Sequence, residues 1–280
     1  YVFCTALSKK YPAQSASLIF LQFLRGKAAE MNEYVKNLNR IEFVITYACT
    51  GRCKHCSEGE HSDVGKHIDG DMAASVVRDV AGRYDVTSVM TFGGEPLLYP
   101  ETVYAVHAAA KELHIPKRQL ITNGFFSKDD MIIKQTAREL ARCGVNAILL
   151  SVDAFHQEII PLVPVIEFAA ELKRLGVWLR VHPVWLVGRG HDNPYNSRTV
   201  ELLSVFESMG IPQSDGNVII PTGNALKYLG DYYNMDKNYT SPYEENPMDI
   251  QAVCVEPDGG LLGGNIYETN ILDILDRYVP

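Results

Sequence analysis

From residue 41 onward, short apolar runs alternate with longer stretches of helical periodicity, and this alternation most constrains the fold of the chain. The apolar runs predict strands at 41–47, 86–92, 119–122, 147–152, 178–186 and 217–220. Between them the pattern predicts helices near 70–83, 101–113, 129–142, 163–175 and 198–209. Such alternation favours a parallel sheet with helices outside it, and right-handed crossovers curl that sheet toward a barrel. We therefore predict an α/β protein built on a partial (β/α)6 TIM-like barrel.

The start of the chain departs from this pattern. Residues 12–39 carry apolar side chains spaced for one helical face, so we predict a packing helix there. We assign residues 1–40 to an N-terminal helical extension and residues 41–226 to the core barrel.

The end of the chain, residues 227–280, is predicted to form a small appendage that opens with a polar, tyrosine-rich loop. A hairpin is then expected to pair 251–256 with 261–266, because Pro257-Asp258-Gly259-Gly260 between them is a turn signal. A short helix from Ile271 to Tyr278 follows.

Composition and charge exclude some classes of partner. The chain has 280 residues and a formal net charge of −8, which argues against a broad surface for nucleic acid or anionic membranes. The longest apolar run near the start, Leu18 to Leu24, is too short to span a bilayer. Three of the six cysteines occupy one loop, which is not the pattern of a secreted disulfide framework. We expect a cytoplasmic protein with no nucleic-acid or membrane partner.

Three cysteines follow the first predicted strand within one short segment. Cys49, Cys53 and Cys56 have the spacing Cys-x3-Cys-x2-Cys, and no fourth cysteine follows nearby. Thiolates are the ligands of iron–sulfur clusters, and a four-iron cubane held by three of them keeps one iron open for chemistry. The segment lies at the carboxyl end of a strand, where barrels place their active sites. The alternative is a structural zinc site with His61 or His67 as the fourth ligand.

This cysteine loop resembles the cluster motif of the radical S-adenosylmethionine (radical SAM) superfamily, and His55 fills the position of the aromatic residue that usually precedes the last cysteine. The resemblance implies one [4Fe-4S] cluster whose open iron binds the methionine half of S-adenosylmethionine. It also implies reductive cleavage of that cofactor to a 5'-deoxyadenosyl radical, which abstracts a hydrogen atom from substrate. The electron would come from a donor such as flavodoxin or ferredoxin. The cofactor carries that chemistry, and the protein positions and shields it.

The second predicted strand ends in Gly93-Gly94-Glu95-Pro96. Paired glycines let the backbone approach a neighbouring group closely, and the adjacent carboxylate can accept a hydrogen bond from an ammonium group. The matching motif of the superfamily contacts the methionine amino group, so the resemblance assigns Gly93, Gly94 and Glu95 to cofactor binding. A plain strand-to-helix turn opened by Pro96 is the alternative.

The third and fourth predicted strands also end in polar residues. Thr122 and Asn123 belong to a Thr-Asn-Gly turn that the family often carries near its cofactor, although a simple turn has the same sequence. Ser151 and Asp153 point to the same side of a strand by alternation. The resemblance assigns Asp153 to the ribose hydroxyls and places Ser151 among the cofactor contacts.

Three further positions are candidates. His156 could contact substrate or donate a proton, and a structural histidine is the alternative. Arg180 on the fifth strand could bind the methionine carboxylate through two hydrogen bonds, and an outer-face salt bridge is the alternative. Gly223 lies in a Gly-Asn-Ala segment similar to a Gly-Arg-Ala segment that many relatives carry near the adenine. Because Asn224 replaces the arginine, only a backbone role at Gly223 is expected.

The segments 121–126 and 151–156 look most like those of peptide-modifying members of the superfamily, including peptide epimerases. Such members bind extra clusters near their C-terminal region, yet here 259–265 lacks cysteine and only Cys254 is close. One cysteine cannot hold a cluster, so we predict no auxiliary cluster. Cys254 could donate a hydrogen atom to a substrate radical, and an inert buried thiol is the alternative. Cys4 and Cys143 are interpreted as packing residues.

The resulting prediction is a radical SAM enzyme, with Cys49, Cys53 and Cys56 as cluster ligands and a peptide or a small molecule as substrate. The catalytic residues beyond the cofactor are not assigned, apart from the candidates Cys254 and His156. Two alternatives come from other classes: a structural zinc protein that uses the cysteine loop, and an iron–sulfur protein without catalysis.

Overall fold

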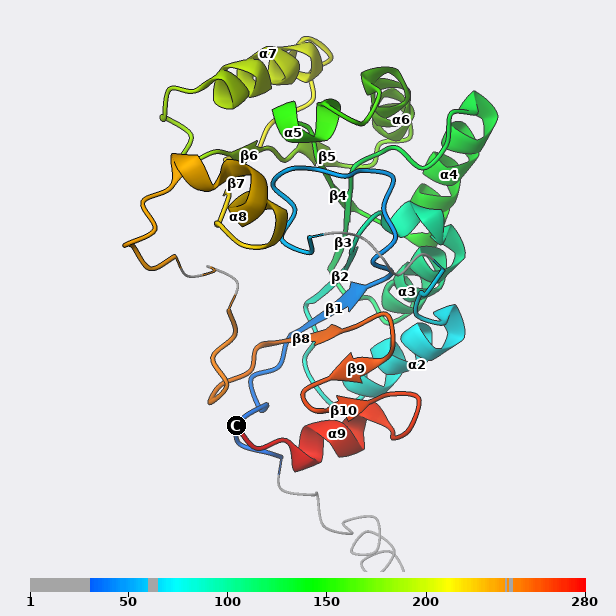
Figure 1. The fold of residues 1–280 in the computed structure, drawn as a ribbon. Helices are drawn as coiled ribbons and strands as arrows, with labels where there is room; N and C mark the ends of the chain where they lie inside the picture. The colour runs from blue at the N-terminus through cyan, green and yellow to red at the C-terminus, as the bar shows by residue number, and fades with distance from the viewer. Residues whose placement is uncertain (1–30, 60–64, 240, 242–243) are drawn as a thin grey trace, which may run out of the picture.

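Six parallel strands form the central sheet of the computed structural model, which describes residues 31–59, 65–239, 241 and 244–280 (Figure 1). Their order is β5-β4-β3-β2-β1-β8, and every neighbouring pair is parallel. The bounds are β1 Arg40–Val44, β2 Ser88–Phe92, β3 Lys117–Thr122, β4 Ala147–Leu150, β5 Leu179–Val181 and β8 Ala252–Val255. The predicted α/β class and partial barrel are confirmed.

The helices between the strands run along one side of the sheet (Figure 1). They are α2 Gly70–Ala81, α3 Pro100–Glu112, α4 Asp130–Cys143 and α6 Leu162–Arg174. Local chemistry sets their ends: Asp129 caps α4 by accepting a hydrogen bond from the Met131 amide. Gly144 ends α4 with a φ of 97°, a conformation that glycine adopts without strain. The predicted helix near 198–209 begins earlier, as α7 Pro194–Ser208. Two short helices follow strands, α5 Ala154–Gln157 after β4 and α8 Gly223–Leu229 after β7, which comprises Asn217–Val218, and the 3-10 helix η2 Gly230–Tyr232 continues from α8.

The two faces of the sheet carry different side chains. One face packs against the helices with fully buried apolar residues: Ile41, Phe43, Val89, Leu120 and Ile148. Alternation places the intervening residues on the other face, which we call the inner face. On the inner face, the strand register aligns four residues in one row across neighbouring strands: Glu42, Met90, Gln119 and Cys254. The inner face is therefore more polar than the helix-covered face.

The run predicted as one strand over 178–186 is divided in two. Residues Leu179–Val181 form β5 in the main sheet, and Val184–Trp185 form β6. Pro183 lies between them and has no amide hydrogen to donate to a neighbouring strand. Strand β6 pairs in parallel with β7, Asn217–Val218, as a separate two-stranded sheet.

The C-terminal region contains a hairpin and a helix, but the predicted pairing of 251–256 with 261–266 is wrong. Strand β8 instead joins the main sheet beside β1, in parallel. The hairpin is shorter and pairs β9, Gly260–Leu261, with β10, Gly264–Asn265. The alternating Val253 and Val255 are buried against the core, so burial at the sheet edge outweighs a local hairpin. The predicted last helix is confirmed as α9, Ile271–Arg277.

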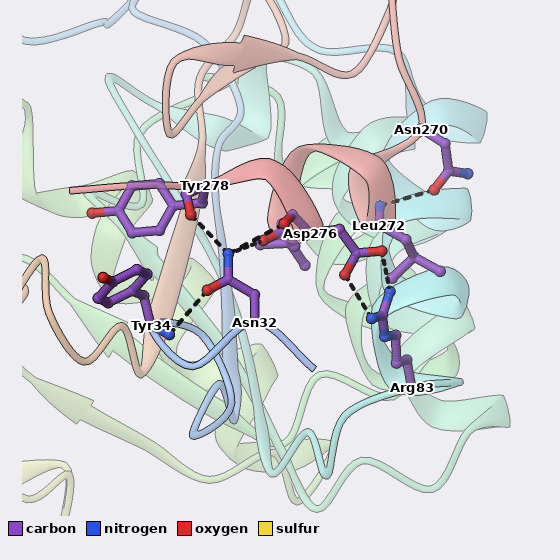
Figure 2. Close-up of polar contacts among 8 residues, drawn as sticks. Asn32, Tyr34, Arg83, Asn270, Leu272, Asp276 and Tyr278 are labelled. Atoms are coloured by element: carbon purple, nitrogen blue, oxygen red, sulfur yellow. Dashed lines mark hydrogen bonds and ion pairs between the residues drawn. The ribbon is translucent and has the colours of Figure 1, made fainter. Parts of the chain in front are cut away.

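The predicted helix over 12–39 lies mostly outside the described residues, as does Cys4. Its described end, 31–39, forms a turn over Glu33–Asn37 and no helix. There the side-chain amide of Asn32 donates to the carbonyl oxygens of Leu275 and Tyr278, at 2.9 and 2.7 Å (Figure 2). This segment therefore satisfies carbonyl groups at the end of α9 that no further helical turn could bind.

A second polar contact holds α9 on the barrel. The guanidinium of Arg83 donates to both carboxylate oxygens of Asp276, at 2.8 and 2.6 Å (Figure 2).

No helix in the described part of the chain combines the length and the apolar composition needed to cross a bilayer.

Candidate active site

The cysteine loop leaves the carboxyl end of β1 and lies beside α8 (Figure 1). A Cβ atom added to Gly51 would lie 3.2 Å from the sulfur of Cys53 and 3.6 Å from that of Cys49. These two thiols therefore converge on the same glycine. The Gly51 amide donates to the Cys49 sulfur at 3.3 Å, and the Cys56 amide donates to the Cys53 carbonyl at 3.2 Å, so the loop turns back on itself.

The three thiols sit in surroundings that oppose their ionisation. Burial raises the pKa of the Cys49 thiol to about 11, and it also raises the pKa values of Cys53 and Cys56. A metal centre deprotonates thiols of this kind outright, because its own charge compensates for their burial. Three such buried sulfurs on one short loop fit metal ligation.

The glycine pair after β2 packs directly on the cysteine loop. The amides of Gly94 and Glu95 donate to the carbonyl oxygens of Thr46 and Ala48, at 2.7 and 2.8 Å. A Cβ atom at Gly94 would overlap the Ala48 carbonyl, and one at Gly93, where φ is 139°, would overlap that of Thr46. The glycines thus allow a close approach between two backbones. The turn alternative is also present, because Pro96 opens the 3-10 helix η1, Pro96–Leu98.

Glu95 links the ends of β2 and β3. Its fully buried carboxylate accepts hydrogen bonds from the Leu97 amide at 3.0 Å, the Thr122 hydroxyl at 2.7 Å and the Asn123 amide at 2.9 Å. Burial raises the pKa of Glu95 to about 7, although these three hydrogen bonds lower it. The contact predicted with an ammonium group would be a fourth bond to this carboxylate.

Asn123 connects β3 to the cysteine loop. Its side-chain amide donates to the Thr50 hydroxyl at 3.2 Å and to the Cys49 sulfur at 3.6 Å. The structure therefore brings together the predicted residues Cys49, Glu95, Thr122 and Asn123.

Asp153 is fully buried and caps α5. One carboxylate oxygen accepts from the amides of Phe155 and His156, both at 3.0 Å. The other lies 2.7 Å from Nδ1 of His156 and accepts from the Val184 amide at 3.2 Å, so Asp153 already has four partner atoms. Burial alone would raise the pKa of Asp153, but the nearby His156 and its hydrogen bonds outweigh that effect and hold it at about 2. The ribose contact predicted for Asp153 would have to replace one of these bonds.

The predicted aromatic position, His55, packs against residues of α5. Its ring centroid lies 4.8 Å from that of His156 and 5.3 Å from that of Phe155. Burial lowers the pKa of His55 to about 4, so its ring is neutral at physiological pH. The structural alternative for His156 is present, because it pairs with Asp153.

In the described part of the chain, no hydrogen bond or ion pair joins Ser151 to Arg180. The Ser151 amide donates to the Thr122 carbonyl at 2.9 Å, which ties the end of β4 to that of β3. The guanidinium of Arg180 packs 5.3 Å from the ring centroid of Trp178, two residues toward the start of β5 and away from the strand ends that carry the cysteine loop. No described residue forms a salt bridge with Arg180, and the strand register places Arg180 on the inner face.

Asn224, to which the sequence pattern assigned no side-chain role, holds the cysteine loop. Its side-chain amide donates to the carbonyl oxygens of Cys53 and Gly59, and its backbone amide donates to that of Cys56. A Cβ atom at Gly223, where φ is 51°, would overlap the Ser57 carbonyl. The one signal in the sequence was that asparagine stands where similar segments carry arginine.

Two other predicted positions lie elsewhere. Cys254 lies on the inner face of β8, in register with Glu42, and burial raises its pKa to about 12. Cys143 is buried at the end of α4, as a packing residue.

Of the proposed zinc ligands, His61 lies outside the described residues. The ring of His67 stacks on Tyr99 with centroids 4.0 Å apart.

The fold and the cysteine loop together are those of a radical SAM protein, and comparisons with known proteins agree. The family model for the radical SAM superfamily matches residues 43–213. A probable GTP 3',8-cyclase of Saccharolobus islandicus is 30% identical over 289 residues, covering 88% of this chain and 89% of the relative. The chain belongs to the radical SAM superfamily. Enzymes of this superfamily use a [4Fe-4S] cluster and S-adenosylmethionine, which decides against the structural zinc alternative.

Solved structures show the same fold at low sequence identity. Streptococcus suis SuiB bound to S-adenosylmethionine superposes with a TM-score of 0.59 at 16% identity, covering 86% of this chain and 66% of that one. The enzyme anSMEcpe with bound S-adenosylmethionine gives a TM-score of 0.56 at 16% identity, covering 86% of this chain and 80% of that one.

Proposed function

We propose that Cys49, Cys53 and Cys56 hold the [4Fe-4S] cluster of a hydrogen-abstracting radical SAM enzyme. The observation that carries this assignment is the convergence of the Cys49 and Cys53 sulfurs on Gly51, in a loop that Gly94 and Asn224 hold from either side. Cluster and cofactor, when bound, supply the 5'-deoxyadenosyl radical that removes a hydrogen atom from substrate. The chain's own residues shape the loop, shield it from water and orient the cofactor.

The cofactor site is proposed along the strand ends beside the loop. Glu95 and Asn123 border it on the β2 and β3 side, and Ser151 and His55 border it on the β4 side. In support, Asn123 already contacts the Cys49 sulfur, and the neutral His55 ring offers a flat surface for stacking. Gly223 brings the backbone of α8 against the loop. We also propose that Asp153 contacts the ribose hydroxyls of the cofactor. In that contact a ribose hydroxyl would displace one of the hydrogen-bond donors that Asp153 now has.

Metal analysis tests the cluster assignment. The protein is reconstituted anaerobically with iron and sulfide, and both are counted per chain alongside the visible absorbance. The Cys53→Ala variant should lose the cluster absorbance, whereas Cys143→Ala, which changes a buried thiol at the end of α4, should keep it. Zinc at one per chain without sulfide, or a full cluster in Cys53→Ala, would contradict the assignment.

Cofactor cleavage tests the activity. With dithionite and S-adenosylmethionine, the wild type should form 5'-deoxyadenosine, and Cys53→Ala should form none. A wild type that holds its cluster but yields no 5'-deoxyadenosine would be an iron–sulfur protein without this catalysis. In the cell the electron is proposed to come from a flavodoxin or ferredoxin in the cytoplasm.

A peptide is the proposed substrate. In support, the segments 121–126 and 151–156 resemble those of peptide-modifying enzymes. SuiB bound to its precursor peptide SuiA has the same fold, with a TM-score of 0.58 at 14% identity, covering 99% of this chain and 73% of that one. If the substrate is a peptide that carries deuterium at the reacting carbon, turnover should transfer that deuterium to 5'-deoxyadenosine.

GTP is the second candidate, favoured by 30% identity to a probable GTP 3',8-cyclase across most of both chains. Incubation with GTP separates the two, because consumption of GTP coupled to 5'-deoxyadenosine would exclude the peptide proposal as the sole activity. We propose no second cluster on residues 227–280, because Cys254 is the only cysteine among them.

A further inference from the structure

Three polar atoms on the inner face are buried and have no hydrogen-bond partner among the described residues: Ser88 Oγ, Gln119 Oε1 and Arg180 Nε. Ser88 is 6% exposed and Gln119 is 4% exposed, and the three come from β2, β3 and β5. Native proteins satisfy nearly all of their buried polar groups, so these exceptions on one face indicate partners outside the chain, either water or a ligand.

The strand register places these residues on one face. Met90, two residues after Ser88, pairs with Gln119, and Gln119 pairs with Ala147. Leu149, two residues after Ala147, pairs with Arg180. Because alternate residues of a strand share a face, Ser88, Gln119 and Arg180 all belong to the inner face.

On the inner face, Ala147 of β4 lies between Gln119 on β3 and the strand that carries Arg180, β5. Ala147 is the neighbour of Gln119 on β4, and Trp178 directly precedes Leu179, the partner of Ile148. The strand register therefore aligns one row across β3, β4 and the start of β5, formed by Gln119, Ala147 and Trp178. The Arg180 guanidinium packs over Trp178, 5.3 Å from its ring centroid, and we infer that its charge lies near the row of Gln119.

The charge of Arg180 is not neutralised by any residue that the structure describes. The other arginine of this face, Arg40, forms an ion pair with Glu42. Lys117, at the start of β3, has a lowered pKa because of burial and of repulsion by Arg40 and Arg180. Glu256 lies beyond β8, at the opposite edge of the sheet. The β3–β5 side of the inner face therefore carries surplus positive charge that a bound anion would offset.

We propose that Arg180 and Gln119 form a subsite for an anionic oxygen group of the substrate, either a carboxylate or a phosphate. The guanidinium supplies paired donors to the anion, and the Gln119 oxygen accepts a hydrogen bond from a donor beside it. This assignment rests on the proposed function, because the inner face leads to the strand ends that carry the cysteine loop. A substrate anchored there presents its other end to that loop.

Calorimetric titration of the anaerobically reconstituted enzyme tests the subsite. The probes are GTP, which supplies phosphates, N-acetylglutamate, which supplies carboxylates, and guanosine, which supplies neither. At least one anion should bind to the wild type, and its affinity should fall by about tenfold or more in Arg180→Gln, as expected for a lost charged hydrogen bond. Gln119→Glu keeps the side-chain shape but repels the anion, so it should show a comparable loss.

Arg198→Gln is the matched control, because Arg198 is an exposed arginine on α7 and should leave anion affinity unchanged. Loss of GTP binding alone identifies a phosphate subsite, and loss of N-acetylglutamate binding alone identifies a carboxylate subsite. Two results overturn the proposal: no anion binding by the wild type at millimolar concentrations, or equal affinity in the wild type and both subsite variants. The titration requires no turnover, so its outcome is independent of 5'-deoxyadenosine formation.

Discussion

The side-chain amide of Asn224 donates to the carbonyl oxygen of Cys53 at 3.2 Å, across a separation of 171 residues. The same amide donates to Gly59 at 3.1 Å, and the backbone amide of Asn224 donates to Cys56 at 2.9 Å. Asn224 is 7% exposed, so water cannot readily replace these bonds. A residue of α8 therefore sets the backbone path between two proposed cluster ligands.

Replacing Asn224 should impair cluster binding while the barrel stays folded. In Asn224→Ala the carbonyl groups of Cys53 and Gly59 lose their donors, which costs about 1–3 kcal/mol of loop stability. We expect lower iron and sulfide content per chain, with an unchanged far-ultraviolet circular dichroism spectrum. Asn238→Ala changes an exposed asparagine and should keep the full cluster. Equal cluster content in both variants would show that the loop holds its path without α8.

A single methyl group at Gly94 should displace the cysteine loop. A Cβ atom there would overlap the Ala48 carbonyl, which is backbone and cannot rotate away. We expect Gly94→Ala to lower the free energy of unfolding by about 1–3 kcal/mol, the usual range for overpacking, and to lower cluster content. Chemical denaturation and iron analysis measure the two effects. Gly190→Ala is the control, because a Cβ atom there meets nothing within 4 Å, and a similar loss in that variant would contradict the close-contact argument.

His107 should make the protein less stable in acid. Its ring is fully buried on α3, and Nε2 lies 2.9 Å from the Thr91 hydroxyl. Burial lowers the pKa of His107 from 6.5 to about 3, so below pH 6.5 the unfolded chain takes up a proton that the folded protein excludes. The free energy of unfolding should therefore fall with falling pH, by up to about 1.4 kcal/mol per pH unit, and this contribution is absent above pH 6.5.

His107→Gln isolates that effect. Denaturation of the wild type and the variant from pH 7 to 4 should show the stability difference shifting in favour of the variant as the pH falls. His114→Asn, at an exposed position after α3, should track the wild type at every pH. Parallel curves for the wild type and His107→Gln would mean that His107 takes up its proton in the folded protein.

Asn32 should protect the last helix from local opening. In Asn32→Ala the carbonyl oxygens of Leu275 and Tyr278 lose a shared donor, and we expect a loss of about 1 kcal/mol. Hydrogen exchange should accelerate in α9 and remain unchanged in β2 and β3. Unchanged exchange in α9 would show that Arg83 and Asp276 hold the helix without help from Asn32.

Much of the barrel was predictable from near neighbours in the sequence. A strand was predicted over 147–152, and β4 occupies Ala147–Leu150, where all four residues are buried. The fifth strand was harder, because the apolar run at 178–186 hides the effect of Pro183 on strand pairing. The partner of β8 was not predictable, since the alternation of Val253 and Val255 suits a hairpin as well as a free edge beside β1.

Cysteine spacing and strand–helix periodicity lie within short stretches of chain, so they indicated the superfamily, the barrel and the cluster loop before any contact was known. The partners of those residues come from distant segments. Asn224 reaches the cysteine loop from α8, and Glu95 binds the turn after β3. Such contacts depend on which strands become neighbours and on how much water their packing excludes. Neither property can be predicted from a local pattern of residues.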